Sequence, residues 1–149
     1  MIITAEQFYS YKGAKTPWVT KNFMWSELLT KQTEKPSLKV LKNLEIVAKK
    51  LQILRDSVFG GRSVTITSGW RSSAYNIKLG GAKQSYHVDG MALDFVVEGL
   101  VPKQVQKILD GIWNGGLEFA GTWTHIDTRP YIARFDEHNK VYVKGQYFS

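Results

Sequence analysis

The sequence predicts a single α+β domain, spanning residues 1–149, with a largely antiparallel sheet and one long helix in its N-terminal half. Three observations predict this fold. The chain is long enough for one domain with a core, and it contains no Pro/Gly-rich linker that would divide it. One segment has the three- and four-residue hydrophobic spacing of an amphipathic helix. The remaining hydrophobic segments are short, rich in β-branched residues and bounded by turns, which is typical of strands in an α+β protein.

The first strong element is a helix that follows Pro36-Ser37 and ends at Gly60-Gly61. About six turns are predicted, with lysines on the solvated face. The apolar residues that define its buried face are Leu38, Leu41, Leu44, Val47, Leu51, Leu54 and Val58. The residues before it are turn-rich, and we expect their aromatic side chains to lie over the main body; these are Phe8, Tyr9, Tyr11, Trp18, Phe23 and Trp25.

Shorter elements follow the long helix. A helix is expected over 72–79, stopped by Gly80-Gly81, and another begins near Pro102 and ends at Gly115-Gly116. Strands are predicted at 63–68, 91–97, 117–119 and 123–127, with a final edge strand around Val141 and Val143.

Composition excludes several classes of protein. Cysteine is absent, which excludes a disulfide scaffold and any cysteine-ligated metal site. No apolar run approaches the roughly 20 residues that span a bilayer, and the N-terminus lacks the pattern of a secretion signal. The net charge of +7 favours an anionic partner, which could be nucleic acid, anionic lipid or cell wall. Of the three histidines, His138 is interpreted as a solvated turn residue.

The segment from Ser85 to Asp94 carries the first chemical signal. His87 precedes a turn, and Asp94 lies in the following predicted strand, seven positions on. Side chains alternate along a strand, so Asp94 points away from Leu93 and Phe95. A carboxylate within such an apolar segment needs a cation, a metal or several hydrogen bonds.

A second segment, 122–127, places Trp123, His125 and Asp127 on one face of a strand by the same alternation. Two imidazoles and one carboxylate form a recurring zinc set that leaves a position for water. His87, Asp94 and His125 could supply that set. The alternative for a histidine beside an aspartate is a hydrogen-bonded residue that binds no metal.

Several motifs in fixed order resemble the zinc murein peptidases of the LAS type, which include D-Ala-D-Ala carboxypeptidases and the L-Ala-D-Glu endopeptidases of phage endolysins. The likeness covers about residues 22–135. The motifs are Asn22-Phe23 with Ser26-Glu27, Leu51-Gln52 with Leu54-Arg55-Asp56, Thr67 to Ser72, Tyr75-Asn76, Gly80-Gly81-Ala82, Ser85 to Asp94, Trp123 to Arg129 and Ala133-Arg134-Phe135.

The resemblance implies a fold like that of the D,D-peptidases and Hedgehog domains, with a zinc site on the sheet. His87, Asp94 and His125 match the family's metal ligands, so Zn²⁺ is the expected cofactor. Arg71 matches an arginine that points at the substrate, where a guanidinium suits a carboxylate; its alternative is a structural salt bridge. Ser85, Tyr86 and Trp123 are expected to bind substrate or to shape the cleft.

One position departs from the family pattern. Members commonly carry a catalytic Glu or Asp three residues before the last histidine ligand, where Thr122 stands here. Threonine cannot take up a proton at neutral pH. Glu118 is the first substitute for the general base and Asp127 is the second. Asp127 could instead orient an imidazole, and Glu118 could be an ordinary exposed strand residue.

The predicted function is zinc-dependent hydrolysis of an amide bond in peptidoglycan stem peptides or cross-links by a monomeric, phage-type lytic enzyme. It would be made in the bacterial cytoplasm without a signal peptide and would act on the cell wall, or be carried in the virion. The alternative is a virion or tail module that keeps the peptidase fold and binds murein with weak or no catalysis. Nucleic acid is not expected as a partner, because the lysines are spread along the chain and no nucleic-acid motif is present.

Overall fold

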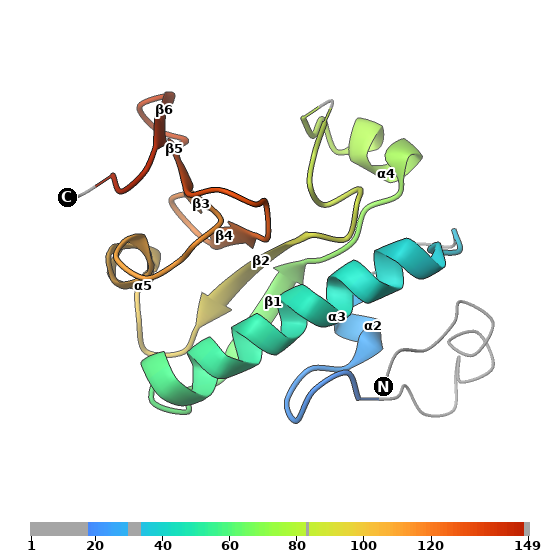
Figure 1. The fold of residues 1–149 in the computed structure, drawn as a ribbon, viewed down its shortest axis with the longest axis horizontal. Helices are drawn as coiled ribbons and strands as arrows, with labels where there is room; N and C mark the ends of the chain where they lie inside the picture. The colour runs from blue at the N-terminus through green and yellow to red at the C-terminus, as the bar shows by residue number, and fades with distance from the viewer. Residues whose placement is uncertain (1–17, 30–33, 83, 148–149) are drawn as a thin grey trace.

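The computed structural model describes residues 18–29, 34–82 and 84–147, which form an α+β domain with one six-stranded sheet (Figure 1). The strand order is β1-β2-β4-β3-β5-β6. The elements are α2 (Trp25–Leu29), α3 (Leu38–Ile53), the π-helical η1 (Leu54–Val58), β1 (Val64–Ser68), α4 (Ser73–Lys78), β2 (Ala92–Val97), α5 (Pro102–Asp110), β3 (Gly116–Phe119), β4 (Thr124–Asp127), β5 (Ala133–Asp136) and β6 (Val141–Lys144). Every strand pair is antiparallel except β3 with β5, so the predicted α+β class is confirmed with a mixed sheet.

The long helix begins where the sequence predicts. Ser37 caps α3 by accepting a hydrogen bond from the backbone N–H of Val40 at 3.2 Å. Its last predicted turn is the π-helical η1, and Gly60 and Gly61 then adopt positive φ angles of 64° and 78° that end the helix. The four lysines of α3 (Lys39, Lys42, Lys49 and Lys50) are exposed, as expected for its solvated face.

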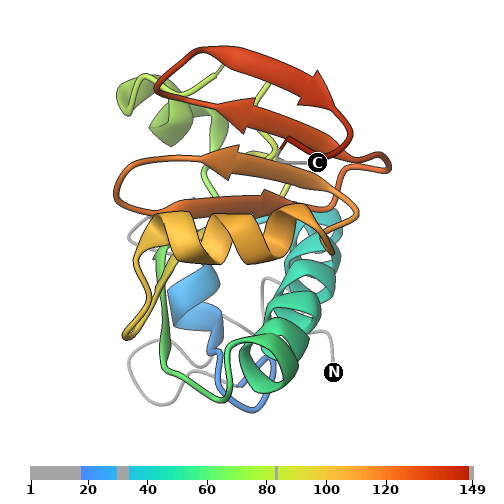
Figure 2. The same cartoon turned by 90° about the vertical axis from the view of Figure 1, so that its left-hand side faces the viewer.

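The helices α3 and α5 cover one face of the sheet and leave the other face for polar residues. Figure 1 shows α3 crossing β1 and β2, and Figure 2 shows α5 lying against β3 and β4. Leu93, Ile126 and Leu117 stand side by side on β2, β4 and β3 and join the helices in one core. Side chains alternate along a strand, so the residues next to these three, Asp94, His125 and Glu118, point to the opposite face.

One expectation about the helices is wrong. The helix that starts at Pro102 ends at Asp110, not at Gly115-Gly116, because the chain turns at Gly111 and Gly116 is the first residue of β3. In the N-terminal region, which the sequence predicts to be turn-rich, the described residues also include one short helix, α2 (Trp25–Leu29).

The N-terminal aromatic residues have mixed environments. Phe23 and Trp25 are buried, as expected, while Trp18 is 59% exposed. The expectations for Phe8, Tyr9 and Tyr11 lie outside the described residues. Within the described ranges, no helix is both long enough and apolar enough to cross a membrane.

A buried arginine joins the end of α5 to the sheet. Arg134 on β5 donates to the Asp110 carboxylate at 2.7 Å and to the backbone carbonyls of Asp110, Trp113, Gly115 and Ala133. It is almost fully buried, and its charge is paired and hydrogen-bonded as a buried charge must be. Arg134 thereby holds the connection that leads into β3.

Candidate metal centre

The histidines and carboxylates meet on the face of the sheet opposite the helices. Asp94 on β2 stands opposite His125 on β4, and His125 stands opposite Glu118 on β3. His87 lies in the turn before β2. Its backbone carbonyl accepts a hydrogen bond from the backbone N–H of Arg71 at 3.1 Å. Neighbouring strands and one adjoining turn thus bring together residues that lie up to 38 positions apart in the sequence.

The three predicted ligands form a tight cluster. One ligand atom from each of His87, Asp94 and His125 lies within 4.8 Å of the others, and all three residues are buried. Asp94 Oδ1 is 3.2 Å from His87 Nε2 and 2.9 Å from His125 Nδ1. The two imidazole rings meet edge to face, with centroids 5.1 Å apart. The structure therefore brings the three residues together.

Each imidazole has its far nitrogen fixed by an acceptor. Nδ1–H of His87 donates to the carbonyl of Gly69 at 2.8 Å, and Nε2–H of His125 donates to the Asp127 carboxylate at 2.8 Å. The remaining nitrogens, Nε2 of His87 and Nδ1 of His125, both point at Asp94. This is how metal-bound histidines are commonly oriented. The donor set fits a divalent metal such as zinc, which prefers imidazole and carboxylate ligands.

The electrostatics of the site favour a positive charge among these groups. Burial disfavours the imidazolium form of His125, but its hydrogen bonds to Asp127 and Asp94 and the nearby charge of Glu118 outweigh this and raise the pKa of His125 to about 10. Burial also opposes ionisation of Asp94, yet hydrogen bonds from His125 and His87 hold the pKa of that carboxyl well below its ordinary value. A cation is therefore stabilised at this position, either as a proton or as a metal ion.

This raised pKa predicts how the metal-free protein responds to pH. The folded-state pKa of His125, about 10, lies above its ordinary value of 6.5. Its protonation therefore contributes stability that is fully present below pH 6.5 and is lost as the pH rises toward 10. Urea unfolding in the presence of a chelator, from about pH 6 to about pH 9, should show falling stability across this range.

The matched control is His125→Gln, in which the fall should be smaller than in the unmodified protein. A stability that stays level or rises between these pH values in the chelated wild-type protein would contradict the prediction.

Asp127 lies behind His125 and does not line the main cleft. Its side chain is fully buried and accepts hydrogen bonds from His125, from the backbone N–H of Gly116 and from both ends of the Arg129 guanidinium fork. Burial acts to raise the pKa of Asp127, but the hydrogen bonds from Arg129 and His125 hold it well below the ordinary value. All of these contacts favour a fixed, ionised acceptor.

A cleft of about 570 Å³ opens over the cluster. Its lining includes the three clustered residues and five further predicted site residues, Arg71, Ser85, Tyr86, Glu118 and Trp123. The Glu118 carboxylate lies 3.1 Å from His125 Nδ1, and its side chain is 38% exposed. Glu118 therefore reaches both the cluster and the solvent of the cleft. Thr122 is exposed in the connection between β3 and β4.

Arg71 is held at the edge of the cluster by several partners. Its Nη2 lies 3.7 Å from Asp94 Oδ2, its Nε donates to Ser68 Oγ at 3.2 Å, and its Nη1 donates to Asn76 Oδ1 at 3.4 Å. Asn76 is buried and also donates to the carbonyl of Ala82. The guanidinium is therefore placed both by an ion pair and by neutral hydrogen bonds, and it still lines the cleft.

The other cleft residues have local roles as well. Ser85 Oγ accepts a hydrogen bond from the backbone N–H of His87 at 3.2 Å, which shapes the turn that carries this histidine. The ring of Tyr86 lies beneath Arg129, with 4.5 Å between the guanidinium carbon and the ring centroid. Trp123 lies just before β4, and its carbonyl accepts a hydrogen bond from Gln106 of α5.

Sequence reasoning missed part of the cleft wall. Arg129, Phe135, Glu137 and Lys140 all line it, the last three from β5 and the turn before β6. Strand β5 was not predicted. Phe135 belongs to one of the motifs that carry the family resemblance, but no signal placed Glu137 and Lys140 near the histidines. For Arg129 a signal was present, since it follows Asp127 by two positions.

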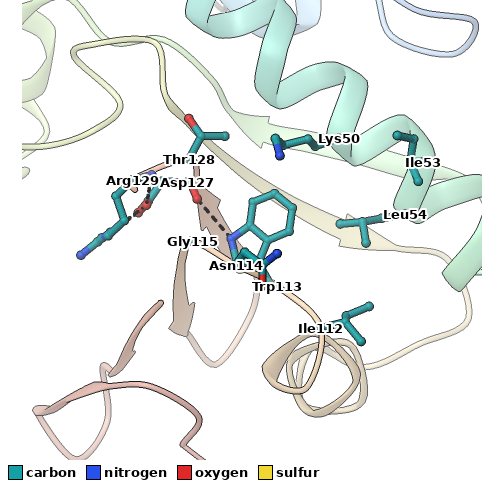
Figure 3. Close-up of a pocket in the computed structure, with 10 residues that line it drawn as sticks. All are labelled: Lys50, Ile53, Leu54, Ile112, Trp113, Asn114, Gly115, Asp127, Thr128 and Arg129. Carbon is teal, nitrogen blue, oxygen red and sulfur yellow. Dashed lines mark hydrogen bonds and ion pairs between the residues drawn. The ribbon is translucent and has the colours of Figure 1, made fainter. Parts of the chain in front are cut away.

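A second, smaller hollow of about 240 Å³ lies behind the cluster (Figure 3). Asp127, Thr128 and Arg129 form one wall. Ile112 and Trp113 line it from the connection after α5, and Leu54 lines it from the start of η1. The indole N–H of Trp113 donates to the Asp127 carbonyl at 3.1 Å and to that of Gly116 at 3.0 Å. The indole thus fixes the backbone of β3 and β4 beneath His125.

An α+β domain with a buried His/Asp/His cluster at the floor of a cleft defines a candidate mononuclear metal centre. A family model described as Peptidase M15 matches residues 21–127, and the chain belongs to this family. This confirms the resemblance to murein peptidases of the LAS type that the sequence motifs indicate.

Two curated relatives match a shorter segment. Peptidoglycan L,D-endopeptidase MepK of Escherichia coli K12 is 36% identical over an alignment of 76 residues that covers 46% of this chain and 42% of that protein. Probable peptidoglycan L,D-endopeptidase MepK of Haemophilus influenzae is 32% identical over an alignment of 74 residues that covers 45% of this chain and 40% of that protein. The match thus spans about two fifths of each relative.

Proposed function

We propose that the protein is a zinc-dependent peptidase that hydrolyses an amide bond in peptidoglycan peptides. The observation that carries the proposal is the buried cluster of His87, Asp94 and His125 at the floor of an open cleft, with Glu118 and Arg71 beside it. Membership of the peptidase M15 family and the similarity to MepK endopeptidases support the substrate class.

His87 Nε2, His125 Nδ1 and the Asp94 carboxylate would hold the metal, because these atoms converge while the other imidazole nitrogens are occupied. Zinc supplies a Lewis acid that lowers the pKa of water to about 7 and polarises a carbonyl. Asp127 would keep the imidazole of His125 in the required orientation and tautomer. This role agrees with its full burial, which denies it access to a substrate.

Glu118 is proposed as the general base. A base must lie within hydrogen-bond reach of the proton that it takes up, and it must be able to exchange that proton with solvent. The Glu118 carboxylate meets both conditions, since it borders the cluster at 3.1 Å from His125 Nδ1 and is 38% exposed. Its oxygen Oε2 would accept the proton of the attacking water and pass it to the leaving amine.

Arg71 is proposed to bind the substrate. Its guanidinium lines the cleft and lies close to Asp94, so it can bind a peptide carboxylate or stabilise charge that develops on the scissile carbonyl oxygen. Ser85, Tyr86 and Trp123 line the same cleft and are proposed as further substrate contacts. The positive net charge would attract an anionic cell wall.

The decisive experiment treats purified, defined muropeptides with the zinc-loaded protein and identifies the products by mass spectrometry. The proposal expects cleavage of a peptide amide, which is lost on chelation and restored by zinc. Products at L-Ala-D-Glu, D-Ala-D-Ala or a cross-link would identify the bond. Intact muropeptides after prolonged incubation, with zinc bound, would contradict the proposal and favour a murein-binding module.

A phage-type lytic role stays a proposal that rests on the resemblance to endolysins. Lysis of purified cell walls tests it, because a lytic enzyme clears them, whereas a virion or tail module binds them without clearing. The proposed place of action is the cell wall, and the proposed monomeric state can be measured by light scattering.

A further inference from the structure

Arg129 contacts both segments that carry the histidines of the cluster. Its Nε donates to Asp127 Oδ1 and its Nη2 donates to Asp127 Oδ2, each at 2.7 Å, while its backbone N–H donates to Oδ1 at 3.2 Å. Asp127 Oδ2 in turn accepts Nε2–H of His125 at 2.8 Å. A single carboxylate is therefore clamped on one side by arginine and presented on the other side to imidazole.

The same guanidinium lies on the second segment. Its central carbon is 4.5 Å from the ring centroid of Tyr86, which directly precedes His87. The carbonyl of Tyr86 accepts a hydrogen bond from the backbone N–H of Met91 at 3.0 Å, which closes the turn that carries His87. Arg129 thus bridges the His87 turn and the His125 strand from outside the cluster.

We infer that Arg129 is a positioning residue for the metal centre: it fixes the plane of the Asp127 carboxylate, which sets the orientation of His125, and it packs the His87 turn against that strand. The inference rests on the proposed metal site and goes beyond it, because Arg129 is not a ligand. The arginine fork matters, since two parallel N–H···O bonds fix a carboxylate plane that a lysine ammonium leaves free to rotate.

The competing role for Arg129 is substrate contact, because it also borders the cleft. The structure favours positioning, since Nε and Nη2 both point at a fully buried carboxylate. The two roles predict different measurements. A positioning residue changes the affinity and the coordination geometry of the metal in the absence of any substrate, whereas a substrate contact changes KM alone.

The test measures metal binding by Arg129→Ala and Arg129→Lys without substrate. Chelator competition gives the zinc affinity, and the visible absorption of the cobalt-loaded protein reports ligand geometry. We expect Arg129→Ala to weaken zinc binding about tenfold, the lower end of the range for residues behind metal ligands, and to alter the cobalt spectrum. Arg129→Lys keeps the charge but loses the fork, so it should show the same spectral change with a smaller loss of affinity.

Arg62→Ala is the matched control, because this arginine is exposed and donates a hydrogen bond to the carbonyl of Glu98, on the turn after β2. Its zinc affinity and cobalt spectrum should equal those of wild type. If Arg129→Ala does not fold, Arg129→Lys decides the matter by its spectrum. Wild-type affinity and spectrum in the folded Arg129 variants, with only KM raised, would overturn the inference. Failure of the wild-type protein to bind zinc would overturn the proposed function as well, so the two failures are distinguishable.

Discussion

Replacement of His87 or His125 by alanine is expected to remove tight zinc binding and to lower peptidase activity by at least about a thousandfold. Each histidine presents one nitrogen to the cluster while its other nitrogen is fixed by a separate acceptor. Alanine removes the ligand and leaves its acceptor, the Gly69 carbonyl or the Asp127 carboxylate, without that donor. Zinc per chain after dialysis and kcat/KM on a defined muropeptide measure the two losses.

His138→Ala is the matched control for these variants. His138 is exposed in the turn between β5 and β6, so its removal should leave zinc content and activity unchanged. Circular dichroism establishes that each variant is folded before activity is compared. A folded His125→Ala protein that is metal-free and fully active would refute the proposed metal chemistry.

Glu118→Gln is expected to lower kcat by about 10²- to 10⁴-fold while zinc content stays at the wild-type value, the range typical for loss of a general acid or base. Glutamine keeps the size of the side chain but cannot take up the proton. Its neutral amide also removes a negative charge 3.1 Å from His125 Nδ1, so zinc affinity must be measured alongside turnover. Glu98→Gln is the control, because Glu98 is exposed in the turn that follows β2.

Asp127→Asn separates the two acids considered for the base. Asp127 contacts His125 from the side away from the cleft, so this variant should bind zinc about 10- to 100-fold more weakly. At saturating zinc its kcat should exceed that of Glu118→Gln. If Glu118→Gln turns over like wild type while Asp127→Asn does not at full zinc loading, the assignment of the base to Glu118 is wrong.

The sequence predicts the elements of the site better than their assembly. Alternation along a strand was sufficient to place Asp94 on the face opposite Leu93 and Phe95, and the structure has Leu93 and Phe95 in the core and Asp94 in the cluster. Alternation within one strand does not give the register between strands. That Asp94 pairs with His125, and His125 with Glu118, depends on long-range pairing of β2, β4 and β3.

There are identifiable reasons why the sequence did not predict strand β5 and the end of helix α5. Strand β5 is four residues long, and the alternation of Ala133 and Phe135 with Arg134 and Asp136 is too short to distinguish a strand from a turn. The strand depends on its long-range parallel pairing with β3, which the local sequence does not contain. The helix α5 was expected to reach Gly115-Gly116, but Gly111 ends it first. Arg134 determines this connection through a long-range ion pair with Asp110, which local propensity does not contain.

The strand order has a consequence for how this scaffold can change. Asp94 and His125 are carried by β2 and β4, each of which has a strand on both sides, whereas β6 forms one edge of the sheet. The part of the cleft wall formed by Phe135, Glu137 and Lys140 belongs to the hairpin at that edge. Amide hydrogens of β2 and β4 should therefore exchange most slowly and those of the hairpin fastest. A hairpin that opens separately can be lengthened, shortened or exchanged to alter peptide selectivity while the metal-holding strands keep their register.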